Sequence, residues 1–218
     1  MEADNLMPKK IDIERYKGFN ELVVGETMEV DVNHISIYIS REKFGRVKPG
    51  TFLIVVSDEG GLIGVVGTKV SKTKYGGEFI SIFLNYGDDA KKMYGDLENE
   101  YVYTVDLIPI YEVDVDGYIK PSFTIFVKPH QPVYLLEDYD IKNLVFDGML
   151  NLSFLLYIKL DDYILCRNLF QVIYDIVRDE VSLDDLLYQF LQYAYRNGSS
   201  LDIVVNIFKE VVGNLDQG

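Results

Sequence analysis

The stretch "YTVDLIPIYEVDVDGYIKP", residues 103–121, decides the fold because it has the pattern of two strands joined by a tight turn. Its first half is rich in β-branched, aliphatic and aromatic residues, which are typical of strands. Asp114-Val115-Asp116-Gly117 follows, and Asp and Gly favour hairpin turns through side-chain hydrogen bonds and positive φ angles. The sequence therefore predicts a β-hairpin with an acidic tip.

The aspartates of this tip allow a second interpretation, a metal or catalytic site. A calcium loop that began at Asp114 would need a glutamate at its twelfth position, where the chain has Ile125. A metal-dependent nuclease, with Asp106, Glu112, Asp114 or Asp116 as ligands, is the enzymatic alternative, but the spacing fits no nuclease motif. We favour the turn, and predict a protein that is not an enzyme, without catalytic residues, metal ligands or cofactor.

The same period of two extends over much of the first half of the chain. "TFLIVVS" (51–57) follows the turn pair Pro49–Gly50, and "LIGVVGTKVS" (62–71) and "EFISIFL" (78–84) follow glycine pairs, while residues 86–100 suggest a short helix. Upstream, two sets of apolar residues alternate with polar ones in opposite phases: Met28, Val30 and Val32, then Ile35, Ile37 and Ile39. Six or more short strands with glycine-rich turns predict a small closed antiparallel barrel.

Beyond about residue 136 the apolar period becomes that of a helix. Ser182 is a typical N-cap for a helix over 183–196, which should end before Asn197–Gly198, and Ser200 opens a final helix. Residues 143–157 are strongly apolar and are also predicted to be helical. Leu165, Leu169, Ile173 and Ile176 share one helix face. The fold class is therefore α+β, with a small antiparallel β-barrel over residues 1–135 and an acidic helical domain over residues 136–218.

Composition limits the cellular setting. The chain has 218 residues and a net charge of −14, and Cys166, its one cysteine, lies in the apolar run "YILCRNLF" as a buried small hydrophobe would. No apolar run approaches the roughly 18 residues that a membrane span needs, and the N-terminus lacks the apolar segment of a secretory signal. We expect a cytoplasmic protein without a membrane partner, and the many Ile, Tyr, Lys and Glu residues suggest a thermophilic or archaeal source.

Two basic segments differ from this acidic background. Negative charge repels nucleic-acid phosphates, so nucleic acid is expected only as an indirect contact. "REKFGRVK" (41–48) carries Arg41, Lys43, Arg46 and Lys48, and "KVSKTK" (69–74) carries Lys69, Lys72 and Lys74. They are either ordinary solvated loops or contacts to an acidic partner, and a nucleic-acid-binding barrel that uses both segments is a further alternative.

The order of these elements resembles the HAS-barrel, the N-terminal barrel of HerA-type hexameric ATPases and ATP-synthase subunits. In "ISIYISREKFGRVKPGTFLIVVSDEGGLIGVV" the resemblance rests on a strand, the turn Val47-x-Pro49-Gly50, a buried strand and a strand containing Gly64. In "EYVYTVDLIPIYEVDVDGYIKPSFTIFVKPHQPVYLLEDYDIKNLV" it rests on the hairpin and a loop from Pro129 to Pro132 before "VYLL". It covers residues about 20–145, and the chain departs from the family where His130–Gln131 replaces a loop glycine and where no Walker motif follows.

The resemblance implies a role in assembly, because such barrels form a collar on a hexameric ring and contact partner proteins. We therefore predict a non-enzymatic interaction protein that docks on a HerA-like DNA-processing ATPase or self-assembles as a homo-oligomer. In the helical part, "LLYQFLQYAY" (186–195) has more apolar surface than one helix face can hide. Tyr188, Tyr193 and Tyr195 are therefore predicted to lie at a partner or self-association surface, unless all three are core residues of the bundle.

Overall fold

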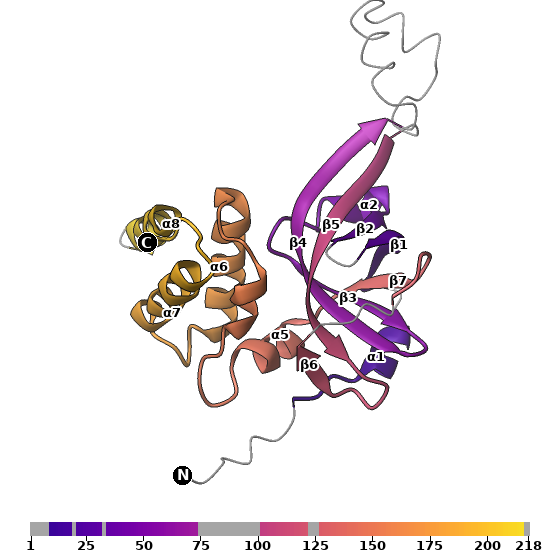
Figure 1. Cartoon of the computed structure of the whole chain (residues 1–218), viewed down its shortest axis with the longest axis horizontal. Helices are drawn as coiled ribbons and strands as arrows, with labels where there is room; N and C mark the ends of the chain where they lie inside the picture. The colour runs from indigo at the N-terminus through magenta and orange to yellow at the C-terminus, as the bar shows by residue number, and fades with distance from the viewer. Residues whose placement is uncertain (1–8, 19–20, 32–33, 74–100, 122–126, 216–218) are drawn as a thin grey trace, which may run out of the picture.

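Six of the described strands close into a barrel in which every neighbouring pair is antiparallel (Figure 1). The order is β2-β1-β7-β3-β4-β5, and pairing of β2 with β5 closes the ring. The computed structural model describes residues 9–18, 21–31, 34–73, 101–121 and 127–215, so the strand predicted at 78–84 and the helix predicted within 86–100 lie outside the described residues. The strands are β1 (Val23–Asp31), β2 (His34–Ile39), β3 (Phe52–Ser57), β4 (Gly60–Thr73), β5 (Tyr101–Val113), β6 (Ile119–Pro121), which extends the sheet beside β5, and β7 (Pro132–Leu135).

Helices follow the barrel, which confirms the predicted α+β class. Two short helices belong to the barrel half, α1 (Ile13–Gly18) and α2 (Arg41–Phe44). The tail consists of α5 (Asp138–Val145), the 3₁₀ helix η2 (Ser153–Tyr157), α6 (Tyr163–Val177), α7 (Leu183–Arg196) and α8 (Leu201–Leu215). No helix in the part of the chain that the structure describes is long and apolar enough to cross a membrane.

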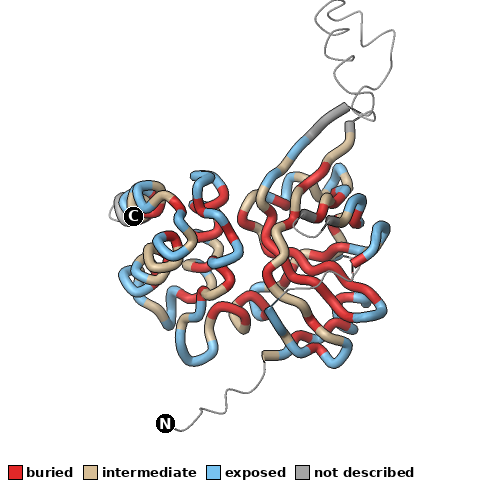
Figure 2. The backbone as a smooth tube through the Cα atoms, in the orientation of Figure 1, coloured by how far each residue is buried: buried red, intermediate tan, exposed pale blue. Residues whose placement is uncertain are grey.

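Strand β3 explains why "TFLIVVS" is apolar at its five central positions, residues 52–56. All six residues of β3 are buried, because one face of the strand points into the barrel and the other points to the helices. Leu53 and Val55 belong to the core inside the barrel, which includes Ile35, Ile37 and Ile39 of β2. Phe52, Ile54 and Val56 belong to a second core, which continues into the helical tail. Figure 2 shows the resulting band of buried residues through the barrel and the adjacent helices.

Aromatic rings join the barrel to the tail. The ring of Phe154 in η2 meets that of Phe52 edge-on at 5.7 Å between centroids, and lies 6.4 Å from the ring of Tyr111 in β5. The turn before β3 contacts α6, where the Asn168 side chain donates a hydrogen bond to the Pro49 carbonyl at 3.0 Å. Cys166 is fully buried in the same core, and burial raises the pKa of its thiol to about 12.

Local signals define the ends of α7 as predicted. The Ser182 side chain accepts a hydrogen bond from the Asp185 amide at 3.1 Å, and Gly198 follows the helix at a φ of +73°.

One predicted element is wrong: residues 143–157 are not a single helix. Helix α5 ends at Val145, a tight turn with Gly148 at a φ of +71° follows, and the chain becomes helical again only as 3₁₀ in η2.

Candidate interaction surfaces

The acidic tip of the β5–β6 hairpin is a turn held by Asp114. The Asp114 carboxylate accepts hydrogen bonds from the amides of Asp116 at 3.1 Å and Tyr118 at 2.9 Å, while Gly117 adopts a φ of +89°. Lys120 contacts the other carboxylate oxygen at 2.7 Å and lowers the pKa of Asp114. These contacts give Asp114 a structural role in the hairpin.

Asp106, one of the acidic residues considered for a nuclease, lies far from this tip. Asp106 lies in the middle of β5, opposite Ser36 and Thr68, and eight residues of extended strand from Asp114 correspond to about 26 Å. Within the described ranges, no three His, Cys, Asp or Glu side chains are grouped closely enough to hold a metal ion.

The two basic segments meet at one end of the barrel. Lys69 of β4 donates a hydrogen bond from its Nζ to the carbonyl of Phe44 at 2.5 Å, and this Nζ lies 3.8 Å from the centroid of the Phe44 ring. Burial, and then the nearby positive charge of Lys48, lower the pKa of Lys69. The Phe44 ring in turn packs on Tyr103 of β5 at 4.6 Å between centroids. Helix α2 is thus fixed against the upper parts of β4 and β5 in Figure 1.

These contacts assign structural roles to part of the basic set. Lys43 donates to the Glu21 carbonyl at 3.1 Å, as Lys69 does to that of Phe44. Arg41, Arg46 and Lys48 are exposed at this end of the barrel. The side chain of Lys72 and the whole of Lys74 lie outside the described residues, so nucleic-acid binding by the two segments stays a prediction.

The three tyrosines of α7 divide between two environments. Tyr188 and Tyr195 are seven residues apart, two helical turns, and expose 63% and 77% of their surface on the same face. The opposite face carries the fully buried Leu186, Phe190 and Ala194. Tyr193 is half-buried and packs against the main core, with the Arg196 guanidinium 5.7 Å from its ring centroid. The structure therefore brings Tyr188 and Tyr195 together and directs Tyr193 elsewhere.

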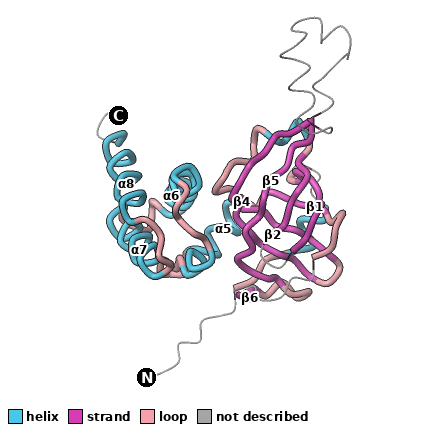
Figure 3. The backbone as a smooth tube through the Cα atoms, turned by 45° about the horizontal axis from the view of Figure 1, so that its top comes forward, coloured by secondary structure: helices cyan, strands magenta, loops and turns pink. Residues whose placement is uncertain are grey.

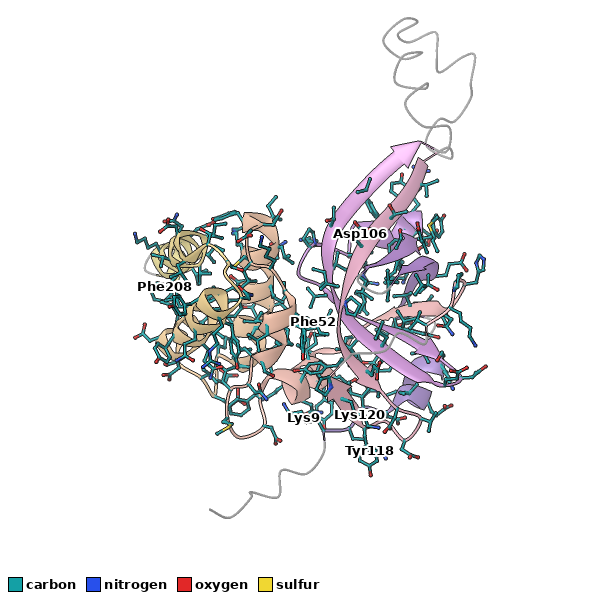
Figure 4. All side chains as sticks on the ribbon, in the orientation of Figure 1. Lys9, Phe52, Asp106, Tyr118, Lys120 and Phe208 are labelled. Carbon is teal, nitrogen blue, oxygen red and sulfur yellow. The ribbon has the colours of Figure 1, made fainter. Side chains whose placement is uncertain are left out.

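A groove that the sequence patterns do not reveal lies between the N-terminal segment, the hairpin tip and α5. It has a volume of about 620 Å³ and its lining includes Arg15, Val115, Tyr139 and Asp140. The N-terminal segment is fixed there because the Ile11 amide donates to the Gly117 carbonyl at 2.9 Å. In Figure 4, Lys9 lies beside this region, close to the labelled Tyr118 and Lys120.

A buried hydrogen bond lies beneath this groove. The Tyr16 hydroxyl donates to Asp140 Oδ2 at 2.5 Å and accepts from the Glu137 amide at 3.1 Å. Burial raises the pKa of Asp140, which the Tyr16 hydrogen bond and the positive charge of Arg15 only partly counter, and burial also raises the pKa of Tyr16. The two residues are 124 positions apart, so no local pattern could have paired them.

This arrangement predicts a pH-dependent stability difference between the wild type and Asp140→Asn. Because the folded-state pKa of Asp140 lies above its ordinary value of 3.8, the folded protein retains this proton to higher pH than the unfolded chain. The stabilisation from protonated Asp140 is therefore complete below pH 3.8 and is lost as pH rises through the folded-state pKa of Asp140. Urea unfolding of both proteins from about pH 4 to pH 8 should show that the free energy of unfolding of the variant increases relative to that of the wild type as pH rises. A difference that stays constant over this range would contradict the prediction, since the other carboxylates are common to both proteins.

Neither a known family model nor a curated protein matches the chain.

Proposed function

We propose that this chain is a non-enzymatic interaction protein, in which the barrel supports a helical tail that docks on a partner protein through α7. The observation that carries the proposal is the exposure of Tyr188 and Tyr195 on one helix face, directly opposite a fully buried stripe. The opposite face of α7 packs within the tail through its buried residues. The two rings therefore lie on the solvent-exposed face, where a partner can contact them.

Tyrosines at such positions suit a protein contact. Each ring has a large apolar surface, and its hydroxyl can hydrogen-bond to water in the free protein or to a partner in a complex. Tyrosine is enriched at interfaces for this reason. Asp184 and Asp185 are exposed in the first turn of α7, and residues 134–218 carry 6 Lys/Arg against 14 Asp/Glu. A partner surface with apolar pockets and neutral or basic edges fits this face best. Two rings do not make an interface of about 800 Å² per partner, so they act as its anchors.

The resemblance of residues about 20–145 to the barrel of HerA-type ATPases supports a hexameric DNA-processing ATPase as the first partner to test. A second copy of the chain is the other partner to consider. Light scattering separates the two, because self-association changes the mass of the purified protein, whereas a different partner is seen only when it is added or captured.

The test of this proposal is the double variant Tyr188→Ser/Tyr195→Ser. We expect the wild type to retain a partner in affinity purification from its own cells, and the double variant to lose that partner with little change in melting temperature. Both side chains are exposed, so their replacement removes contact surface and leaves the core intact.

The matched control is Tyr38→Thr, which removes an exposed tyrosine from β2 on the barrel. Figure 3 shows β2 in the barrel and α7 on the far side of α5 and α6. The control should retain the partner. Retention of the same partner, in the same amount, by the double variant would show that α7 is not the docking face.

A further inference from the structure

Two grooves meet at Tyr139, in the first turn of α5. One is the groove of about 620 Å³ between the N-terminal segment, the hairpin tip and α5. The other, of about 430 Å³, lies between α5 and α6, and Val172 and Ile176 contribute to it. Tyr139 lines both and is 66% exposed, although α5 buries Ile141, Leu144 and Val145 on its other face. A large exposed ring where two hollows join is a suitable anchor for an extended ligand.

The lining of this double groove is partly apolar. Val115 at the hairpin tip is 68% exposed and lines the first groove. The hydrogen bond from the Ile11 amide to the Gly117 carbonyl joins this tip to the N-terminal segment, which forms the opposite side of the groove. In the second groove, Val172 and Ile176 of α6 are only partly buried. A ligand with apolar side chains at intervals along an extended backbone would find a contact at each position.

The rim of the double groove is acidic. Its described lining residues include six acids, Asp12, Glu14, Asp116, Asp138, Asp140 and Asp175, against three bases, Lys10, Arg15 and Lys142. Arg15 is paired with Glu137, and Lys142 is paired with Glu180. Because neither glutamate lines the groove, the positive charges of both bases are already neutralised by acids outside it. Asp140 is buried and bonded to Tyr16, and Glu14 is paired with Lys17 at 2.7 Å, which leaves four acids to face a ligand: Asp12, Asp116, Asp138 and Asp175.

We propose that the double groove binds a positively charged, extended segment of a partner protein, with Tyr139 as its anchor. Lysine or arginine side chains of that segment would meet the acidic rim, stack on the Tyr139 ring, or both, and its apolar side chains would cover Val115 and Val172. This site is separate from the α7 face and does not depend on it. It therefore goes beyond the docking role proposed above.

The proposal can be tested by fluorescence anisotropy with the full chain and a labelled cationic peptide, Gly-Lys-Leu-Arg-Leu-Lys-Gly. We expect saturable binding at low ionic strength that weakens as salt is added, because exposed charges are screened. Tyr139→Ala should weaken binding by about ten-fold, since it removes both the stacking surface and the apolar contact. Asp116→Asn/Asp175→Asn should weaken it and also reduce its salt dependence.

Two controls establish that the peptide binds in this groove and through its charge. Tyr38→Ala removes an exposed tyrosine from β2 on the barrel and should bind the peptide as the wild type does. The charge-inverted peptide Gly-Glu-Leu-Asp-Leu-Glu-Gly should not bind. The proposal is overturned if the cationic peptide shows no saturable binding at low salt, or if Tyr139→Ala binds it as tightly as the wild type. It is also overturned if Tyr139→Ala converts an oligomer to a monomer, because the occupant is then a second copy of this chain.

Discussion

Replacing Phe154 with alanine is expected to lower the free energy of unfolding by about 3–5 kcal/mol, the range for removing a fully buried phenylalanine. Phe154 has no exposed surface, and from η2 in the tail it contacts the barrel through the rings of Phe52 in β3 and Tyr111 in β5. Its loss would leave a cavity between η2 and the barrel that rigid strands on one side cannot fill. Urea or thermal unfolding followed by circular dichroism measures the effect.

Leu156→Ala is the matched control for this change, because Leu156 lies in the same 3₁₀ helix but is exposed. It should cost no more than about 0.5 kcal/mol, as surface substitutions usually do. If both variants lose the same stability, the effect comes from η2 itself and not from the contact between tail and barrel. A Phe154→Ala protein with wild-type stability would show that the core between the two halves adds little.

The barrel strands could be predicted because their determinants are local. Ile35, Ile37 and Ile39 alternate with polar residues and are all fully buried inside the barrel. The same reasoning is misleading at Met28, which is exposed, whereas Thr27 is buried, because a bulge between Thr27 and Glu29 shifts the phase of β1. Closure of the barrel depends on pairing of β2 with β5, which are far apart in the sequence, and no local pattern specifies that pairing.

Helix boundaries were predictable wherever a side chain caps the helix. Ser182 and Gly198 delimit α7 through contacts within a few residues, and the structure has both ends where these residues place them. The apolar run 143–157 gave no such signal, because its hydrophobic residues serve three different elements that pack on the same core. Gly148 interrupts it, and a run of apolar residues by itself does not distinguish one helix from a helix, a turn and a 3₁₀ helix.

The candidate surfaces were only partly predictable. Excess apolar residues in α7 drew attention to its tyrosines, but only helix packing shows that Tyr193 turns toward the core while Tyr188 and Tyr195 face outward. Tyr139 and the Tyr16–Asp140 hydrogen bond were missed, because their surroundings are assembled from the N-terminal segment, the hairpin tip and α5. A tyrosine on the polar side of the amphipathic helix α5 is the one sequence signal that could have identified Tyr139.

Replacing Gly50 with alanine is expected to lower the free energy of unfolding by about 2–4 kcal/mol, the sum of a conformational and a steric cost. Gly50 is buried in the turn before β3 with a φ of +88°, and alanine at such a φ costs about 1 kcal/mol. A Cβ there would also lie 2.7 Å from the backbone nitrogen of Leu169, closer than real contacts allow. Because Leu169 is fully buried in α6, relief requires a shift of the helix against the barrel, which adds about 1–3 kcal/mol.

Gly198→Ala separates these two contributions. Gly198 has a similar φ of +73°, but a Cβ at this position would meet nothing within 4 Å, so only the conformational cost of about 1 kcal/mol remains. The excess loss in Gly50→Ala, measured by urea unfolding of both variants, reports the close approach of the Pro49–Gly50 turn to α6. Equal losses would mean that α6 moves away from the turn at no cost, and that the packing of barrel against tail does not depend on this contact.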